Sequence, residues 1–200
     1  RVPGVVPATV LVIGGGTVGE HAARAAVGAG ADVTILEANG DRLRQLDALF
    51  PHARVLMSDT HRLDEELPRA DVVVGSVLVP GASAPKLVRR EHLSIVKPHA
   101  LLVDVAVDQG GCFETTRPTT YDDPVYAVDG IRHYCVANLP GAVPVTATQS
   151  LTHATSPYVM ALARGVDSAL ENDAALAAGL STRAGQLHSP GVAAAFPGLP

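Results

Sequence analysis

Three glycines follow an apolar segment near the start of the chain, and they are the residues whose spacing most suggests chemistry. The segment Thr9–Ile13 leads directly into Gly14, Gly16 and Gly19, which fit the pattern G-x-G-x-x-G. In this pattern the first glycine permits a tight turn, the second lets backbone approach a pyrophosphate, and the third lets helix pack on strand. A helix that starts at this turn offers unpaired N–H groups and a positive dipole to phosphates.

An acidic residue stands where this pattern requires one. A second strand-like segment, Asp32–Leu36, ends in Glu37, and a carboxylate roughly 20 residues beyond the glycines can bind the hydroxyls of an adenosine ribose. The sequence of strand, glycine turn, helix, strand and acid therefore favours a dinucleotide site. A structural turn without a ligand is the alternative interpretation.

Composition excludes several other classes of function. The chain has 200 residues, of which 47% are hydrophobic and 18% charged, and a net charge of −5 without a basic run. Nucleic acid and anionic membranes are therefore not expected partners, and no stretch reaches the roughly 18 apolar residues of a membrane span. Cys112 and Cys135 with scattered histidines give no metal-ligand spacing, and they predict reduced thiols in a cytoplasmic protein.

The elements around the glycine turn alternate between strand and helix, which predicts an α/β Rossmann-type, doubly wound parallel sheet of six strands. Expected strands after the first are 33–36, 53–57, 70–75, 100–107 and 133–137. Expected helices are 17–29, one capped by Asn39 or Asp41 that carries Leu43 to Phe50, a short polar one at 63–67, and 87–96. Ligands bind outside the carboxyl ends of such strands, where Glu37, residues 76–78, Asp108 and Asn138 all fall.

The composition changes near residue 140, so we expect a domain of residues 1–145 and a C-terminal helical segment of residues 146–200. Pro157 suits the first turn of a helix, and Tyr158, Leu162, Val166 and Leu170 recur at helical spacing after it. This predicts one helix from Pro157 to Leu170 whose apolar stripe must be covered by another surface.

Four separated motifs, taken together, resemble one family. They are Ile13–Gly19, Leu78–Lys86, Val103–Cys112 and Tyr134–Pro140, which reads Tyr-Cys-Val-Ala-Asn-Leu-Pro. In this order they resemble NAD-dependent alanine dehydrogenase, and the resemblance runs from residue 1 to about residue 189. The NAD-binding subunit of transhydrogenase and saccharopine dehydrogenase share parts of it.

The resemblance implies roles for individual residues. It places Asp108 in the chemistry, where it would position and polarise the water or amine, although an aspartate that only caps the Gly110-Gly111 turn is the alternative. Glu37 would hold the adenosine ribose, where the family usually has Asp. The residues expected to bind NAD are Gly14, Gly16, Thr17, Val18, Gly19, Glu37, Arg42, Ser58, Val77, Leu78, Val105, Val107, Asp108, Val136 and Asn138.

The resemblance also implies an N-terminal substrate domain, with a lysine and a histidine, ahead of the first strand seen here. The Pro157–Leu170 helix would pack on that domain. The complete protein would be a homo-oligomer that converts L-alanine to pyruvate and ammonium, while residues 1–200 alone would be inactive. The alternatives are a non-catalytic NAD(H)-binding module and a transhydrogenase-type NAD(H)-binding domain.

Overall fold

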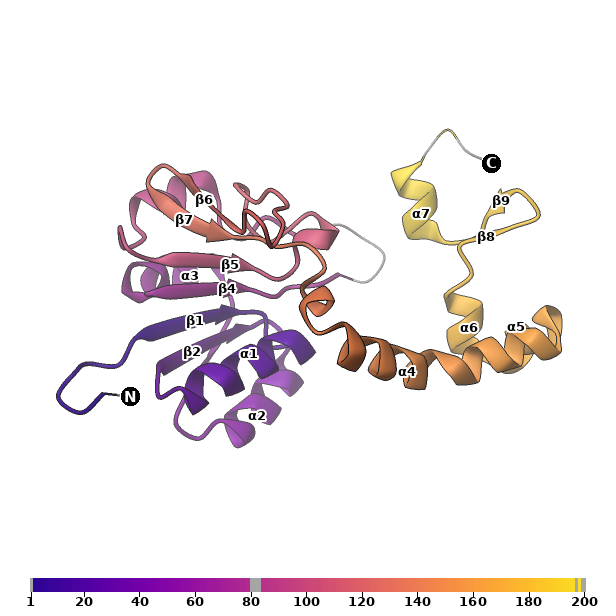
Figure 1. The fold of residues 1–200 in the computed structure, drawn as a ribbon, viewed down its shortest axis with the longest axis horizontal. Helices are drawn as coiled ribbons and strands as arrows, with labels where there is room; N and C mark the ends of the chain where they lie inside the picture. The colour runs from indigo at the N-terminus through magenta and orange to yellow at the C-terminus, as the bar shows by residue number, and fades with distance from the viewer. Residues whose placement is uncertain (1, 80–83, 197, 199–200) are drawn as a thin grey trace. The chain divides into compact units, whose positions relative to one another are not determined.

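The computed structural model describes residues 2–79, 84–196 and 198, which form two compact units (Figure 1). The first unit is Arg1–Asn138 and the second is Leu139–Pro200. The division therefore falls after Asn138, somewhat before the expected boundary at residue 145.

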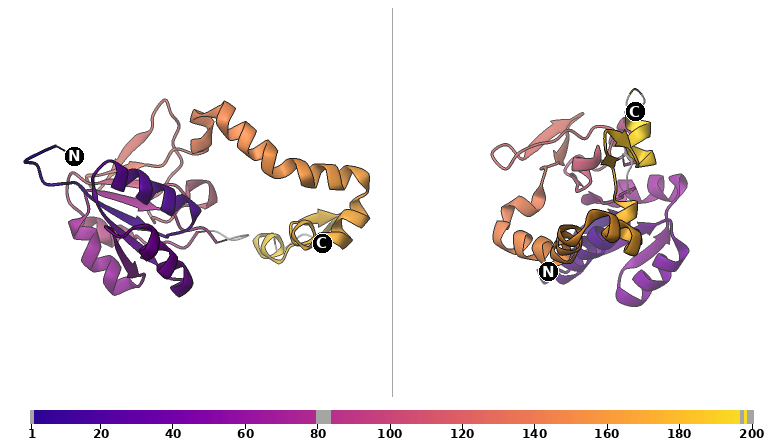
Figure 2. Two further views of the ribbon diagram at one scale, coloured as in Figure 1. Left: turned by 90° about the horizontal axis from the view of Figure 1, so that it is seen from below. Right: turned by 90° about the vertical axis from the view of Figure 1, so that its right-hand side faces the viewer.

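A twisted sheet forms the centre of the first unit (Figures 1 and 2). It has seven strands in the order β3-β2-β1-β4-β5-β7-β6, and every neighbouring pair is parallel except β6 and β7. The strands are β1 (Thr9–Ile13), β2 (Asp32–Glu37), β3 (Arg54–Met57), β4 (Val72–Gly75), β5 (Leu101–Asp104), β6 (Val125–Val128) and β7 (Ile131–Tyr134). The order reverses between β1 and β4, so the carboxyl ends of these two strands flank a topological switch point.

The sheet has one strand more than the six expected. Val125–Val128 pairs antiparallel with β7 across a two-residue turn at Asp129 and Gly130. Both turn residues have positive φ, 50° and 83°, which is the conformation that two-residue hairpins require. Asp129 and Gly130 are thus the turn of a hairpin formed by β6 and β7.

Helices cover the two faces of this sheet. Helices α1 (Thr17–Gly28) and α2 (Gly40–Leu49) lie on the face where Val12, Ile35 and Leu46 are buried. Helix α3 (Thr60–Glu66) and the 3-10 helices η1 (Leu67–Arg69) and η2 (Arg90–Ser94) follow on the other side, where a second core contains Phe113. Of the two caps expected for α2, Asn39 and Asp41, the structure has Asn39, whose side chain accepts from the N–H groups of Asp41 and Arg42.

The helix expected over residues 87–96 is wrong. Only Arg90–Ser94 forms a short 3-10 helix, because the preceding backbone pairs with the segment after β5. Leu87 N–H donates to the Cys112 carbonyl at 2.8 Å, and Glu114 N–H donates to the Val88 carbonyl at 2.8 Å. Part of the expected ligand loop 76–86, residues 80–83, lies outside the described residues.

The second unit is built mainly from short elements. It contains η4 (Leu139–Ala142), α4 (Pro144–Arg164), α5 (Val166–Asn172), α6 (Ala174–Ala178), α7 (Pro190–Ala195) and the hairpin β8 (Thr182–Arg183) with β9 (Gln186–Leu187). The single helix expected from Pro157 to Leu170 is wrong, since α4 begins at Pro144 and Pro157 lies inside it. Gly165, with φ 155° and ψ 118°, ends α4 and divides the expected apolar stripe between two helices.

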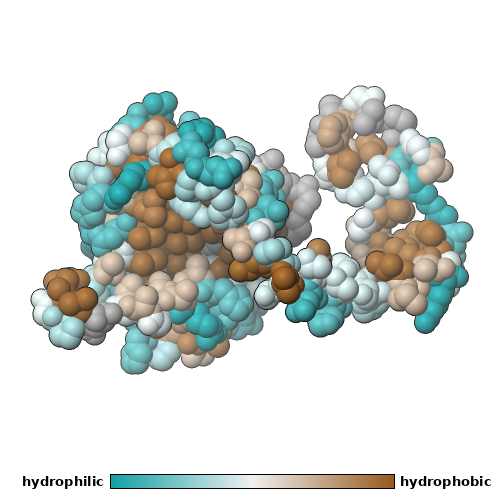
Figure 3. Space-filling view, in the orientation of Figure 1, coloured by the Kyte–Doolittle hydropathy of each residue, from teal (hydrophilic) through white to brown (hydrophobic). Residues whose placement is uncertain are grey.

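Apolar surface gathers over the central strands on one face of the first unit (Figure 3). Val72, Val103 and Val105 are only partly buried against the core beneath α1 and α2. Within the described residues, no helix combines the length and apolar character needed to cross a membrane.

Candidate cofactor-binding site

The glycine turn joins β1 to α1 with the geometry that the sequence predicts. Gly14 has φ 95° and its N–H donates to the Leu36 carbonyl at 2.8 Å, so the turn continues the pairing of β1 with β2. A Cβ on Gly19 would lie 1.8 Å from the Gly14 carbonyl oxygen. Gly19 must therefore be glycine for α1 to pack on the end of the strand.

Gly16 has a different reason to be glycine. It is the N-cap of α1 with φ −62° and ψ −168°, which any residue can adopt, and a Cβ built on it meets nothing within 4 Å. No side chain among the described residues caps this helix. The first N–H groups of α1 therefore face open space beside Gly16, which is the arrangement that binds phosphate.

Glu37 and Arg42 both hydrogen-bond to Gly15, which lies between Gly14 and Gly16 in the turn. The Glu37 carboxylate accepts from Gly15 N–H at 2.8 Å and from Asn39 N–H at 2.8 Å. Arg42 Nε donates to the Gly15 carbonyl at 2.7 Å, and its Nη2 donates to Glu20 at 2.6 Å. Both expected adenosine-side residues thus stand at the glycine turn, and each still has unused hydrogen-bonding capacity.

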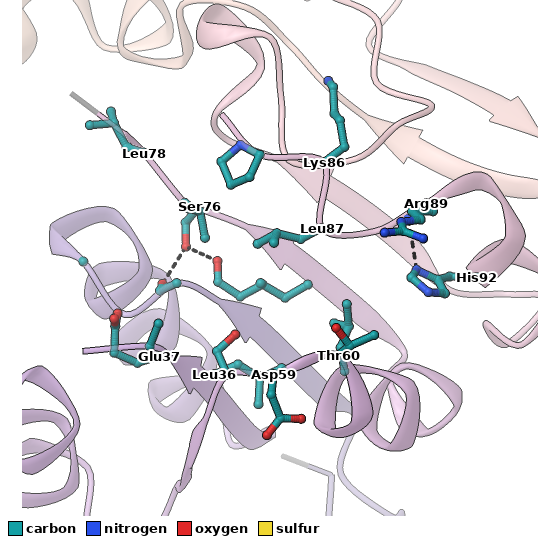
Figure 4. Close-up of a pocket in the computed structure, with 18 of the residues that line it drawn as sticks. Leu36, Glu37, Asp59, Thr60, Ser76, Leu78, Lys86, Leu87, Arg89 and His92 are labelled. Atoms are coloured by element: carbon teal, nitrogen blue, oxygen red, sulfur yellow. Dashed lines mark hydrogen bonds between the residues drawn. The ribbon is translucent and has the colours of Figure 1, made fainter. Parts of the chain in front are cut away.

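Ser76 is a residue that the sequence did not single out for this role. It follows β4 directly, and its hydroxyl donates to the Gly14 carbonyl at 2.8 Å, with the Ile13 carbonyl 3.1 Å away (Figure 4). A Cβ on Gly19 would also lie 2.7 Å from this hydroxyl. Ser76 therefore fastens the end of β4 to the turn, at the switch point of the sheet.

A cavity of about 770 Å³ opens beside the turn (Figure 4). It brings together many of the residues expected to bind the nucleotide, which are Gly14, Gly16, Thr17, Val18, Glu37, Ser58, Val77 and Leu78. Gly19 and Arg42 do not line it; Gly19 is buried and Arg42 lies behind Gly15. Polar residues that the sequence did not indicate also line it, among them Asp59, Asp64, Lys86, Arg89 and His92.

The residues expected around the nicotinamide form a separate group at the ends of β5 and β7. Val107 and Val136 are buried, Val105 is half-buried, and Asp108 and Asn138 are exposed. None of these five lines the cavity. Asp108 lies on the 3-10 helix η3 (Val107–Gln109), and both its carboxylate oxygens lie 3.2 Å from Asn138 N.

Asp104, and not Asp108, organises the glycine loop that follows β5. Its buried carboxylate accepts from Ala106 N–H at 3.1 Å, from Phe113 N–H at 3.2 Å and from the Thr116 hydroxyl. A Cβ on Gly111, whose φ is 79°, would lie 2.6 Å from the same carboxylate. Asp108 is exposed at the surface, where its carboxylate accepts from Asn138 N–H.

Lys86 lines the cavity and also contacts the glycine loop that follows β5. Its ammonium donates to the carbonyls of Gly110, Gly111 (3.0 Å) and Phe113 (3.3 Å), and Ala84 N–H donates to the Gln109 carbonyl at 3.0 Å.

Beneath the loop, burial raises the pKa of the Cys112 thiol to about 11, so this cysteine is a neutral packing residue and not a nucleophile.

Known proteins resemble nearly all of this chain. Residues 1–190 match the family described as alanine dehydrogenase/PNT, C-terminal domain. The chain is 54% identical to an alanine dehydrogenase of Halomonas elongata, with 98% of this chain and 53% of that protein covered. It is 55% identical to the alanine dehydrogenase of Mycobacterium tuberculosis, with 96% and 52% covered.

Solved structures agree with the sequence comparison. An L-alanine dehydrogenase structure superposes with a TM-score of 0.87 at 47% identity, covering 98% of this chain and 55% of that one. A transhydrogenase from Sinorhizobium meliloti gives 0.65 at 30% identity, covering 72% and 41%. The chain spans about half the length of the curated relatives that it matches. The chain therefore belongs to the alanine dehydrogenase/PNT C-terminal domain family, as its four sequence motifs indicate, and NAD is the cofactor of this domain.

Proposed function

We propose that the cavity beside the glycine turn holds the adenosine and pyrophosphate of NAD(H), and that the domain serves the reversible oxidative deamination of L-alanine. The observation that carries the proposal is the open N-terminus of α1 at Gly16, next to a cavity of about 770 Å³ that Glu37 also lines. The open N-terminus of a helix binds phosphate, and a carboxylate such as that of Glu37 binds a ribose diol. The residues present therefore fit NAD(H).

The proposed roles follow the order of the strands. Gly14, Gly16, Thr17 and Val18 surround the pyrophosphate, with Gly19 supporting the turn. Glu37 accepts from the ribose hydroxyls, Arg42 fixes the glycine turn beside them, and Ser58, Val77 and Leu78 contact the adenosine. The nicotinamide lies against a surface of five residues, Val105, Val107, Asp108, Val136 and Asn138.

NAD supplies the hydride acceptor for oxidation of the alanine Cα–H bond, and overall L-alanine, water and NAD⁺ give pyruvate, ammonium, NADH and a proton. We assign to Asp108 the positioning and polarisation of the water or amine. Its carboxylate is exposed at the end of β5 and accepts from one backbone N–H group, that of Asn138. Lone pairs of both oxygens remain available to a substrate proton.

The substrate, the homo-oligomeric state and the cytoplasmic setting belong to the same proposal. A second candidate is an NAD(H)-binding module that does not itself turn over, of a kind related to transhydrogenase. The observation that favours keeping it is the match to a transhydrogenase structure at 30% identity.

Titration of the 200-residue chain with NADH, followed by calorimetry or fluorescence, tests the binding proposal. We expect saturable binding, and an absence of binding would refute it. Formation of NADH from NAD⁺ and L-alanine separates the two candidates. Activity in any form of the protein that contains this domain supports the dehydrogenase, whereas NADH binding without turnover in every such form supports the module.

A further inference from the structure

The glycine turn carries features of both common dinucleotides. A carboxylate at the end of the second strand, here Glu37, is typical of NAD sites, whereas a nearby arginine accommodates the 2′-phosphate of NADP. Arg42 is such an arginine, because its Nε donates to the same residue, Gly15, whose N–H is bound by Glu37. The two opposite charges therefore meet at one residue of the turn.

Arg42 is engaged by three acceptors of the protein as the chain folds. Its Nη2 donates to Glu20 Oε2 at 2.6 Å, and its Nη1 donates to Gln45 at 3.0 Å. With Nε on Gly15 as well, each of the three guanidinium nitrogens has an acceptor. The Arg42 and Glu20 side chains are 24% and 19% exposed, so this ion pair is better shielded from water than the other pairs of α1 and α2.

Glu20 is the anion that pairs with Arg42, and it comes from a different element. It lies in the first turn of α1, while Arg42 lies in the first turn of α2. Its other oxygen accepts from Arg24 Nη2 at 2.9 Å, on the exposed side of α1. The two arginines hold the pKa of the Glu20 carboxyl below its ordinary value, Arg42 having the larger effect.

We propose that Glu20 is a cofactor-specificity residue, which acts by pairing with Arg42 so that the arginine binds a 2′-phosphate less tightly. The inference rests on the proposed binding of NAD(H) in the cavity. Discrimination against NADP(H) then has two parts: direct repulsion by Glu37, and neutralisation of Arg42 by Glu20. Charge pairing that denies a competing ligand its partner is a form of selection against that ligand.

The test compares NADH and NADPH affinities of the 200-residue chain by fluorescence titration. In Glu20→Ala, Nη2 of Arg42 is released while Nε stays on Gly15, so we expect the ratio of NADH to NADPH affinity to fall about tenfold, the value of one charge-assisted hydrogen bond. Glu20→Gln keeps the side-chain shape and should give a smaller fall. Thermal melting verifies that each variant is folded.

Two further variants identify the cause. Arg24→Ala removes the other partner of Glu20 and should leave the ratio within twofold of the wild type. The gain in NADPH affinity that Glu20→Ala is expected to produce should be absent from the double variant Glu20→Ala/Arg42→Gln. An unchanged ratio in both Glu20 variants, or a gain that persists in the double variant, would overturn the inference. Failure of the wild-type chain to bind NADH would instead overturn the proposed function, so the two failures are distinguishable.

Discussion

Asn138 N–H points at the carboxylate of Asp108, with the nitrogen 3.2 Å from each oxygen. This contact joins the loop after β5 to the loop after β7. Asn138 has φ 50°, in the left-handed region that asparagine tolerates better than most residues. The conformation of one loop end thus directs the acidic side chain of the other.

Asp108→Asn should reduce turnover with little effect on folding. The amide keeps the shape and an acceptor for Asn138 N–H, but it removes the charge that polarises the reacting group. In a form of the protein that oxidises alanine we expect kcat to fall ~10²-fold or more, with NAD affinity nearly unchanged. Steady-state kinetics together with NADH titration measure both. A variant that kept most of its kcat would make Asp108 a loop-orienting residue.

Glu37 should give the site a preference for NAD(H) over NADP(H). Its carboxylate is held at the turn by the N–H groups of Gly15 and Asn39, where it accepts from ribose hydroxyls and repels a 2′-phosphate. Glu37→Gln should weaken NADH binding. The ratio of NADH to NADPH affinity should fall by about tenfold, the value of one charge-assisted contact. Calorimetric titration with both cofactors measures the preference. Equal or tighter binding of NADPH by the wild type would contradict this role.

Asp71 should make stability depend on pH in the acid range. Lys97 at 2.8 Å, Thr9 N–H and His99 lower the pKa of this carboxyl from 3.8 to about 2. Because the folded pKa is the lower one, the stabilisation is complete above about pH 4 and is lost as pH falls towards 2. Asp71→Asn should cost about 1–2 kcal/mol at pH 7, discounted for partial exposure, and should flatten this dependence.

Urea unfolding between pH 2 and pH 7 measures the Asp71 effect. Asp32→Asn, at an exposed carboxylate on β2, is the matched control and should leave the slope of stability against pH in place. An identical pH dependence in wild type and Asp71→Asn would show that the Lys97 pair is not formed in solution.

The apolar faces predict self-association of residues 1–200. Exposed side chains on α4, Val145, Leu151, Tyr158, Val159 and Met160, favour burial against another surface. We expect concentration-dependent oligomers by light scattering, reduced when residues after Asn138 are removed, and no alanine-dependent NADH formation by this chain alone. A monomeric chain that oxidises alanine would contradict both expectations.

The sequence predicted the parts of the site that local chemistry determines. The three glycines, the Asn39 cap and the placement of Glu37 each depend on a turn or a strand end, and the structure has all of them. Contacts between elements distant in the sequence could not be predicted from the sequence alone. The hydroxyl of Ser76 meets the Gly14 carbonyl across 62 residues, and the Glu20–Arg42 pair spans 22.

One error and one omission have clear physical reasons. The polar stretch Thr146–Ser150 has no apolar period and therefore reads as a loop, although Pro144 at the first turn of α4 was a usable signal for its start. Asp104 lies inside an apolar run and reads as a strand residue. Its burial becomes understandable only from Phe113 N–H and Thr116, which the fold brings to its carboxylate.

NADH titration of wild type, Gly16→Ala and Gly19→Ala, each with a melting curve, tests whether the N-terminus of α1 binds the pyrophosphate. A Cβ at position 16 meets no protein atom within 4 Å but enters the space beside the open helix end, whereas one at position 19 lies 1.8 Å from a backbone oxygen. We expect Gly16→Ala to melt like the wild type and to bind NADH at least ~10-fold more weakly, while Gly19→Ala should lose stability as well. A wild-type chain that does not bind NADH, or a Gly16→Ala variant that binds it equally well, would contradict pyrophosphate binding at the N-terminus of α1.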